Sequence, residues 1–268
     1  MVERMAETQK DRPGAPETTH FGFRRVETGE KAGLVRAVFD SVAGRYDLMN
    51  DLMSVGIHRL WKAALVDWLA PRAGIRLLDV AGGTGDVALR VLARVGGAEV
   101  NEYSGGAITI CDINETMLKA GRAKARDRGL EGGVRYLGAD AEALAVADRS
   151  VDAYTVAFGL RNVTRLEAAL GEAMRVLKPG GRFLCLEFSR VSVPLLGEIY
   201  DRYSFAVLPR IGEIVTGDAG AYRYLVESIR RFPPQDTFAG MLTAAGFDLV
   251  KYRDLSGGIA ALHSAWRL

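Results

Sequence analysis

A glycine-rich segment is the part of the chain whose residue types and spacing could most clearly support chemistry. It runs from Leu78 to Asp86 and reads LDVAGGTGD, an apolar stretch followed at once by a turn. Glycine lets the backbone approach a ligand closely, and a helix that begins at the turn offers unpaired N–H groups to a polar or anionic group. We therefore expect Gly83, Thr84 and Gly85 to bind a nucleotide-like ligand. A purely structural tight turn is the alternative.

Two acidic residues follow at the ends of the next two apolar stretches. Asp112 lies 33 residues after Asp79, the acid that precedes the glycines. At the tip of a second parallel strand, its carboxylate can accept hydrogen bonds from both hydroxyls of a ribose, which suits either NAD or S-adenosylmethionine. Asp140, followed by Ala141, ends the third stretch and could accept the exocyclic amine of adenine. Its alternative role is the N-cap of a short helix.

The three strand ends together resemble the Rossmann-like S-adenosylmethionine-dependent methyltransferases. In that superfamily a glycine loop, a ribose-binding acid and an adenine-binding acid follow one another in this order. The loop usually reads acid-x-Gly-x-Gly-x-Gly, and here Ala81 stands at the first glycine. The resemblance implies S-adenosylmethionine as cofactor and S-adenosylhomocysteine as its product.

Four further segments resemble one family within that superfamily, the ubiquinone/menaquinone biosynthesis C-methyltransferases, or UbiE family. Tyr46 to Trp61 (YDLMNDLMSVGIHRLW) and Arg175 to Ser189 (RVLKPGGRFLCLEFS) resemble its signature sequences. Phe158 to Thr164 and Ser228 to Gln235 also match its pattern. The resemblance extends from about Phe21 to Leu268, nearly the whole chain.

This resemblance implies transfer of a methyl group to a ring carbon of a polyprenylated quinol. The acceptor is a methoxy-benzoquinol in the ubiquinone branch and demethylmenaquinol in the menaquinone branch. The family's cofactor contacts correspond to Thr84, Asp112, Asp140 and Ala141. Many family members have serine just before the Phe-Gly-x-Arg-Asn segment, where this chain has Ala157. A hydroxyl contact to the cofactor is therefore lost there or taken by water.

Methyl transfer to carbon also needs a group that raises electron density on the acceptor ring, which removal of a phenolic proton would do. The sequence shows no His-Asp pair at an obvious strand end. Arg161, on the loop after the fourth strand, is the best catalytic candidate and is expected at the mouth of the cleft. Because arginine is almost never deprotonated, it would stabilise a phenolate or orient a water molecule. A structural arginine beside a helix cap at Asn162 is the alternative.

Two other functions are compatible with parts of the sequence. An NAD-dependent oxidoreductase would use Gly83, Gly85 and Ala88, which satisfy the pattern G-x-G-x-x-A, together with Asp112. It leaves both signature segments unexplained. A non-catalytic cofactor-binding subunit of a quinone-biosynthesis complex is the second alternative.

The pattern of apolar residues predicts the elements that must position these side chains. Two helices, at residues 31–43 and 57–69, precede an alternation of strands and helices, which is typical of an α/β fold with helices on both faces of a parallel sheet. We expect a Rossmann-like, doubly wound, mostly parallel sheet that ends in an antiparallel hairpin. Its strands are expected at 77–80, 107–111, 134–137, 153–158, 182–187, 247–252 and 259–268, and its helices from 86 and at 117–128 and 166–177.

We expect a disordered tail at residues 1–20 and, in view of the resemblance, a single methyltransferase domain at 21–268. Within that domain, residues 21–70 are expected to form a helical cap, and residues 195–235 a lid or substrate-binding insertion. Closure over the substrate is expected of Tyr46, Asp47 and His58. For Met49, Met53 and Trp61, packing in the core is the alternative to closure. For Tyr200, Tyr203 and Phe205, a wall for the isoprenoid tail and packing in the core are both open.

Composition limits the function classes. Of 268 residues, 49% are hydrophobic, and 35 basic against 33 acidic side chains give a net charge of +2. This excludes a disordered chain and shows no electrostatic footprint for nucleic acid. No apolar run is long enough to span a membrane, so we expect a cytoplasmic protein with peripheral membrane contact at most. The two cysteines are expected to be reduced core thiols, and the three histidines show no metal-ligand spacing. A homodimer or a quinone-biosynthesis complex remains open.

Overall fold

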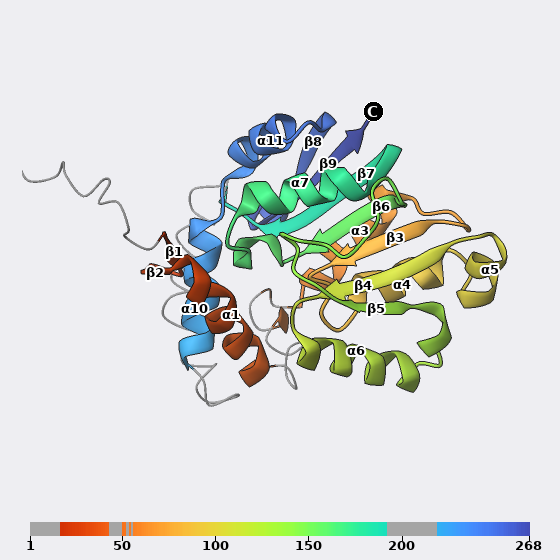
Figure 1. Cartoon of the computed structure of the whole chain (residues 1–268), viewed down its shortest axis with the longest axis horizontal. Coiled ribbons are helices and arrows are strands. Elements are labelled where there is room, and N and C mark those ends of the chain that lie inside the picture. The colour runs from red at the N-terminus through yellow and green to blue at the C-terminus, as the bar shows by residue number, and fades with distance from the viewer. Residues whose placement is uncertain (1–16, 43–49, 52–53, 55, 192–218) are drawn as a thin grey trace, which may run out of the picture.

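A seven-stranded sheet forms the centre of the computed structural model, which describes residues 17–42, 50–51, 54, 56–191 and 219–268 (Figure 1). The strand order is β5-β4-β3-β6-β7-β9-β8. The strands are β3 (Arg76–Val80), β4 (Ala107–Asp112), β5 (Arg135–Gly138), β6 (Val151–Ala157), β7 (Leu177–Phe188), β8 (Asp248–Leu255) and β9 (Ala260–Arg267).

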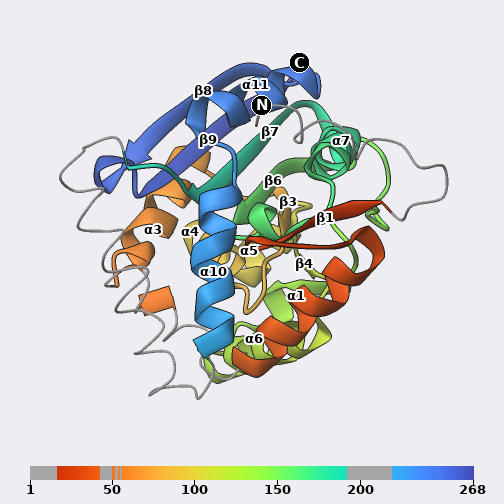
Figure 2. The same cartoon turned by 90° about the vertical axis from the view of Figure 1, so that its left-hand side faces the viewer.

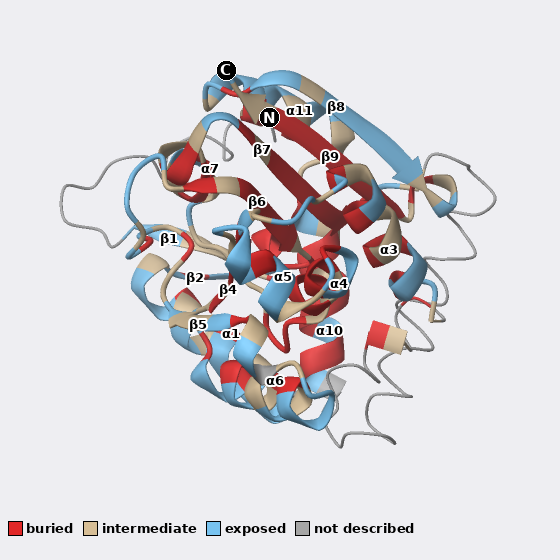
Figure 3. Ribbon diagram, turned by 90° about the vertical axis from the view of Figure 1, so that its right-hand side faces the viewer, coloured by how far each residue is buried: buried red, intermediate tan, exposed pale blue. Residues whose placement is uncertain are grey.

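The sheet is mixed, as the sequence predicts. Strands β5, β4, β3, β6 and β7 are parallel, whereas β9 is antiparallel to both β7 and β8. The central strands are nearly continuous apolar runs because helices cover both of their faces. Figure 3 shows this burial along β6, β7 and β9. The carboxyl ends of the parallel strands therefore meet at one edge of the sheet.

Helices lie on both faces of the sheet. Residues of α3 (His58–Leu69), α4 (Asp86–Arg94) and α6 (Glu115–Asp127) pack in one core cluster, and those of α7 (Leu166–Val176) and α11 (Gln235–Ala244) in a second one. The short helix α5 (Ala98–Tyr103) leads into β4. Short 3-10 turns lie at Glu131–Gly133, Leu160–Asn162 and Ser256–Gly258.

A second layer lies outside the main sheet and brings together segments far apart in the sequence. The small antiparallel sheet of β1 (Thr18–Phe21) and β2 (Arg24–Glu27) leads into α1 (Thr28–Val42), which packs beside α10 (Ala219–Arg231) (Figure 2). The ring of Phe21 stacks on that of Tyr224 at 4.2 Å between centroids. The beginning of the chain is thus held against a helix near its end.

The structure differs from the sequence-based expectations at several places. Thr18 to His20, assigned to the tail, belong to β1, where they pair with β2. Strand β7 begins five residues earlier than expected, because Leu177 pairs with Val151 before a bulge in the register. Helices α5, α10 and α11 were not predicted. Residues 1–16 of the expected tail, and 195–218 of the expected insertion with Tyr200, Tyr203 and Phe205, lie outside the described residues.

Candidate functional site

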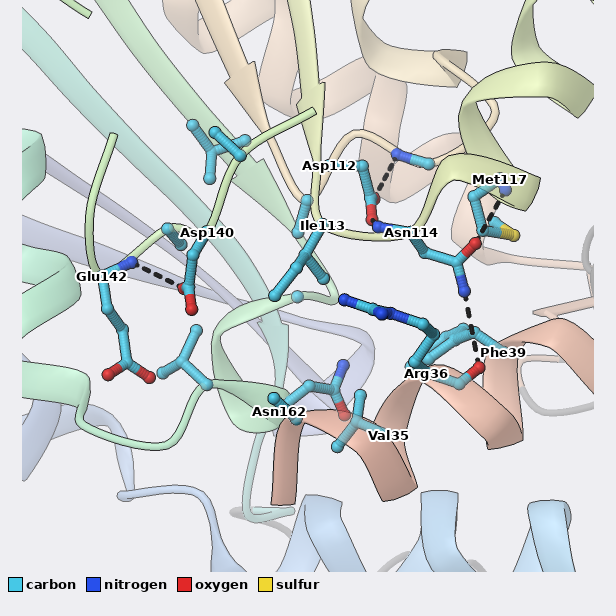
Figure 4. A pocket seen from close by; sticks show the side chains of 18 of the residues that line it. Val35, Arg36, Phe39, Asp112, Ile113, Asn114, Met117, Asp140, Glu142 and Asn162 are labelled. Atoms are coloured by element: carbon cyan, nitrogen blue, oxygen red, sulfur yellow. Dashed lines mark hydrogen bonds between the residues drawn. The ribbon is translucent and has the colours of Figure 1, made fainter. Parts of the chain in front are cut away.

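A pocket lies at the carboxyl ends of β3, β4, β5 and β6, where the sequence predicts a ligand (Figure 4). Helix α1 covers it, and Arg36 extends from that helix into it. The lining residues are Ala32, Val35, Arg36, Phe39, Val80, Ala81, Gly83, Asp112, Ile113, Asn114, Met117, Ala139, Asp140, Ala141, Glu142, Phe158, Gly159, Asn162, Val163 and Thr164.

Asp112 lines this pocket with a carboxylate whose orientation the backbone fixes. Its Oδ2 accepts the N–H of Gly83 at 2.9 Å, and its Oδ1 accepts the N–H of Asn114 at 2.8 Å. Burial raises the pKa of Asp112, while these N–H groups act in the opposite direction by stabilising the charged form. Each carboxylate oxygen has two lone pairs, so both can still accept a hydroxyl of a ligand.

The glycine loop packs tightly against the elements around it. Gly83 and Gly85 adopt positive φ angles of 54° and 79°, where side chains are strained. A Cβ on Gly85 would lie 2.6 Å from Cδ1 of Ile110, and one on Gly83 would lie 3.0 Å from Cε of Met117. Ala81 is strained in the same way, with φ of 50° at the position where the superfamily usually has glycine.

The loop after β5 brings Asp140 and Ala141 to the pocket. The N-cap alternative for Asp140 is wrong, because no helix begins there. Instead, its Oδ1 accepts the N–H of Glu142 at 2.9 Å and closes a local turn. Glu142 in turn accepts the N–H groups of Thr164 and Arg165 at 2.6 and 2.9 Å. The loops after β5 and β6 are thereby joined at the pocket.

Polar contacts hold α1 over the pocket. Asn114 caps α6 by accepting the N–H of Met117 at 3.0 Å (Figure 4). Its Nδ2 donates to Oδ1 of Asp40 in α1 at 3.0 Å. At the other end of the helix, Nζ of Lys31 donates to the carbonyl of Val163 at 2.7 Å. Both contacts join α1 to residues that line the pocket, so α1 forms part of the site.

A second, smaller cavity adjoins the first at the glycine loop, and Ala81 lines both. Its other lining residues are Lys62, Asp79, Gly82, Thr84, Asp86, Val87 and Ala157. Asp79 accepts Oγ1 of Thr155 at 2.6 Å and the N–H of Ala88 at 3.3 Å. Burial raises the pKa of Asp79 to about 7. Thr84, a predicted cofactor contact, and Ala157, which stands where many family members have serine, therefore line this cavity.

Arg161 lines neither cavity. Its side chain is 1% exposed, and its Nη1 donates to Oε2 of Glu187 at 3.0 Å and to the carbonyl of Phe158 at 2.6 Å. Burial raises the pKa of Glu187, and Arg161 opposes that shift. The expected position at an open cleft mouth is thus wrong, because the pair is sealed in the core. Nε and Nη2 of Arg161 have no hydrogen-bond acceptor in the structure as described.

The structure shows a His-Asp pair that the sequence analysis missed. Nε2 of His58 lies 2.8 Å from Oδ1 of Asp51, which also pairs with Arg59. Burial lowers the pKa of His58. His58 is the first residue of α3 and Asp51 precedes that helix, so the pair lies away from the strand ends. The only signal in the sequence was the shared signature segment. His58 lines neither cavity. Trp61 packs against Phe158 and Phe188. The other residues expected to close over the substrate or to pack in the core, Tyr46, Asp47, Met49 and Met53, lie outside the described residues.

The residues around the two cavities fit S-adenosylmethionine. Asp112 presents an oriented carboxylate for a ribose, and Ile113, Met117 and Ala141 add apolar surface for an adenine ring. The glycine loop separates this pocket from the smaller cavity, which is lined by charged side chains. Among the described residues, no group of His, Cys, Asp and Glu could hold a metal ion, both cysteines are buried and free, and no helix is long and apolar enough to cross a bilayer.

The fold and this pocket define the class of Rossmann-like S-adenosylmethionine-dependent methyltransferases. The chain is similar in fold to a methyltransferase from Thermotoga maritima described as a possible histamine N-methyltransferase, with a TM-score of 0.60 and 20% identity over 87% of this chain and all of the other. It also resembles the [4+2]-cyclase SpnF, with a TM-score of 0.58 and 20% identity over 78% and 80%. Because this fold supports different reactions, these likenesses show the fold alone.

Sequence relatives identify the family. Residues 26–267 match the model of the ubiE/COQ5 methyltransferase family, and the chain belongs to that family. It is 57% identical to the ubiquinone/menaquinone biosynthesis C-methyltransferase UbiE of Cereibacter sphaeroides over 94% of this chain and 97% of the relative. The UbiE of Paracoccus denitrificans is 56% identical over 96% and 99%. These relatives support neither the NAD-dependent oxidoreductase nor the non-catalytic subunit.

Proposed function

We propose that this protein transfers the methyl group of S-adenosylmethionine to a ring carbon of a polyprenylated quinol in ubiquinone or menaquinone biosynthesis. The observation that carries the proposal is the 56–57% identity to UbiE enzymes over nearly the whole length of both chains. The pocket agrees with it, since Gly83, Asp112, Asp140 and Ala141 line one continuous surface. The two acceptors, methoxy-benzoquinol and demethylmenaquinol, both remain candidates.

The protein's tasks follow from the chemistry of the cofactor. When bound, S-adenosylmethionine supplies a methyl group that is already activated by its sulfonium sulfur. The chain therefore has to orient the cofactor, exclude water and hold the acceptor carbon in line with the methyl group. Asp112 and the glycine loop orient the nucleoside, and α1 covers it. Increasing the electron density on the ring requires a group that accepts the phenolic proton or stabilises the resulting phenolate.

Arg161 remains our catalytic candidate, and its role would be to stabilise a phenolate or to orient a water molecule. The free donors of its guanidinium support this role: Nε and Nη2 are buried and have no acceptor in the described structure, whereas Nη1 donates to Glu187. A quinol oxygen that reached these two nitrogens would receive charge-assisted hydrogen bonds. The competing role, a purely structural ion pair, has the geometry described above in its favour.

Incubation with methyl-labelled S-adenosylmethionine and each demethylated quinol tests the proposed function directly. We expect one labelled methyl group on a ring carbon, identified by mass spectrometry and NMR, together with S-adenosylhomocysteine. A titration with NAD serves as control and is expected to show no binding. If neither quinol is methylated while the cofactor binds, the proposed acceptor class is wrong.

A prenylated acceptor resides in the bilayer, so we propose a cytoplasmic protein with peripheral membrane contact. Flotation with liposomes that contain a prenyl quinol tests this contact. No flotation with or without the quinol would indicate that a partner delivers the substrate. A homodimer or a complex with other quinone-biosynthesis proteins stays a prediction, which sedimentation of the purified chain can test.

A further inference from the structure

The smaller cavity contains a buried lysine to which no role has been assigned. Lys62 lies in α3, just beyond the first signature segment, and its side chain is 6% exposed. Its neighbours in the helix, Trp61, Leu65 and Val66, are core residues. Its Nζ nevertheless reaches the cavity wall, where it lies 3.0 Å from Oδ2 of Asp86. An ammonium group has three donors, and Asp86 accounts for one of them.

The position of this cavity relative to the pocket suggests what part of a ligand enters it. Asp112 and Asp140 belong to the large pocket, Thr84 and Ala157 to the small one, and Ala81 to both. If the nucleoside of the cofactor occupies the large pocket, as the proposed function requires, the amino-acid end of the same molecule extends past Ala81. That end carries an α-carboxylate, which needs cationic or N–H partners if it is to leave water.

The charges around the small cavity favour an anion. Although burial alone would raise the pKa of Asp86, the cations Lys62, Arg90 and Lys124 hold it far below its usual range. Asp86 is therefore ionised at neutral pH, whereas Asp79, the other carboxyl group that lines this cavity, has its pKa raised to about 7 by burial and is partly protonated. Helix α4 also begins at Asp86, and its first N–H groups have no partner within the helix, although that of Ala88 is donated to Asp79. A ligand carboxylate in this cavity would therefore still meet more positive than negative charge.

We infer that Lys62 binds the α-carboxylate of S-adenosylmethionine, resting on the proposed function. The cavity brings together a buried ammonium, the start of α4 and the glycine loop, at the side of the loop away from Asp112. A purely structural pair with Asp86 predicts that loss of Lys62 lowers stability, because it leaves a buried carboxylate without its partner. It predicts no preference for ligands that carry a carboxylate, whereas a binding role does. Lys62 thus determines specificity for the amino-acid end of the cofactor.

Two product-like ligands separate this role from a structural one. S-adenosylhomocysteine carries the α-carboxylate, whereas 5′-methylthioadenosine has the same nucleoside and sulfur without the amino-acid group. We expect Lys62→Met to weaken S-adenosylhomocysteine by about 10- to 100-fold in calorimetric titration, as for a charge-assisted hydrogen bond, and 5′-methylthioadenosine by less than about twofold. Lys62→Arg, which keeps the charge, should retain at least part of the preference. An equal loss for both ligands in Lys62→Met would overturn the inference.

Lys178→Met is the matched control, since Lys178 pairs with Asp152 at 2.6 Å far from either cavity and is half-exposed. It should bind both ligands as the wild type does. If Lys62→Met does not fold, the wild-type protein still gives the answer with S-adenosyl-3-thiopropylamine, which lacks only the carboxylate of S-adenosylhomocysteine. We expect it to bind at least tenfold more weakly, and equal affinity would overturn the inference alone. Failure of the wild type to bind any of these ligands would overturn the proposed function as well.

Discussion

Two carboxylates near the ends of parallel strands, Asp112 partly buried and Glu187 fully buried, are stabilised in opposite ways. Asp112, at the end of β4, is held by two backbone N–H groups and faces a pocket. Glu187, the second-last residue of β7, is held by Arg161 and lines neither cavity. Backbone N–H groups leave a carboxylate charged and able to accept further hydrogen bonds, whereas a guanidinium neutralises it. The first arrangement suits binding, and the second suits a structural pair, which is the alternative role of Arg161.

The largest expected effect comes from breaking the Arg161–Glu187 pair on one side. Glu187→Leu leaves the guanidinium of Arg161 buried without its partner, which typically costs about 3–5 kcal/mol of unfolding free energy. Urea unfolding measures this loss. The double variant Arg161→Met/Glu187→Leu removes both charges and should recover most of the stability, because a buried pair can be replaced by apolar residues of similar volume.

Turnover in these variants decides between the two roles of Arg161. If Arg161 acts on the quinol, Arg161→Ala and the stable double variant both bind S-adenosylhomocysteine normally but lose at least about tenfold in kcat, as for loss of an electrostatic contact in the transition state. A double variant with wild-type kcat would show that Arg161 is structural. The Arg161–Glu187 pair would then be purely structural, in contrast to Asp112 at the pocket.

Asp79 is a third case, because it is buried without a guanidinium partner and without the two backbone N–H groups that hold Asp112. It accepts hydrogen bonds only from Thr155 and from the N–H of Ala88 in the structure as described. Its folded-state pKa of about 7 lies above the ordinary value of 3.8, so the native state binds more protons than the unfolded state between these values. Stability therefore falls as pH rises from about 4 to about 7. Between pH 5 and pH 8 this contribution changes by roughly 3 kcal/mol, and Asp79→Asn should abolish it.

The measurement is the difference in unfolding free energy between wild type and Asp79→Asn at several pH values. The difference cancels other groups that titrate in this range, including His263, whose pKa burial lowers to about 4 and which has the opposite effect on stability. We expect the variant to gain relative to the wild type as pH rises. A difference that does not vary with pH would mean that Asp79 is charged throughout.

Asp112→Asn tests the pocket side of the comparison. The substitution keeps the shape but removes the charge and one acceptor, so we expect S-adenosylhomocysteine to bind about 10- to 100-fold more weakly. Because Asp112 contacts the nucleoside in our proposal, 5′-methylthioadenosine should lose affinity equally, unlike in Lys62→Met. Unfolding in urea should change far less than for Glu187→Leu, and a comparable loss would indicate that Asp112 too is mainly structural.

Most of the central sheet and the helices α3, α4, α6 and α7 could be predicted from the sequence, because most central strands contain a short apolar run and these helices alternate with them or precede them with apolar residues at helical spacing. The position of Gly83, Asp112 and Asp140 at the pocket followed from the rule that parallel strands present their carboxyl ends at one edge, and that of Ala141 from the family resemblance. Side-chain pairing was not predictable in this way. Arg161 and Glu187 are 26 residues apart, and only the register of β6 with β7 brings them together.

Lys62 shows the same limit for the second cavity. It lies in an amphipathic helix where its sequence neighbours indicate a packing face, and nothing local reveals that its ammonium reaches Asp86. Helix α10 was not predicted for a related reason. It packs against α1 and the turn after β6, which are distant in sequence, and its Tyr222 and Tyr224 are buried. Pairs that depend on tertiary packing are therefore where the structure adds most.

The smallest expected effect concerns backbone strain at the pocket. Ala81 and Phe158 both have positive φ angles, 50° and 60°, at the ends of the neighbouring strands β3 and β6. A left-handed conformation costs a non-glycine residue about 1–2 kcal/mol, and glycine has an entropic cost of about 0.5–1 kcal/mol. Ala81→Gly should therefore stabilise the protein by up to about 1 kcal/mol, a shift in Tm of a few degrees at this chain length. The methyl group of Ala81 lies close to Gly159, where a Cβ would come within 2.4 Å of it, so its removal also loses some packing and limits the gain. Calorimetry of the ligand-free protein measures the shift, with Ala88→Gly in α4 as a control that should destabilise. A lower Tm for Ala81→Gly would mean that the contact of the Ala81 methyl group with its neighbours outweighs the relief of strain.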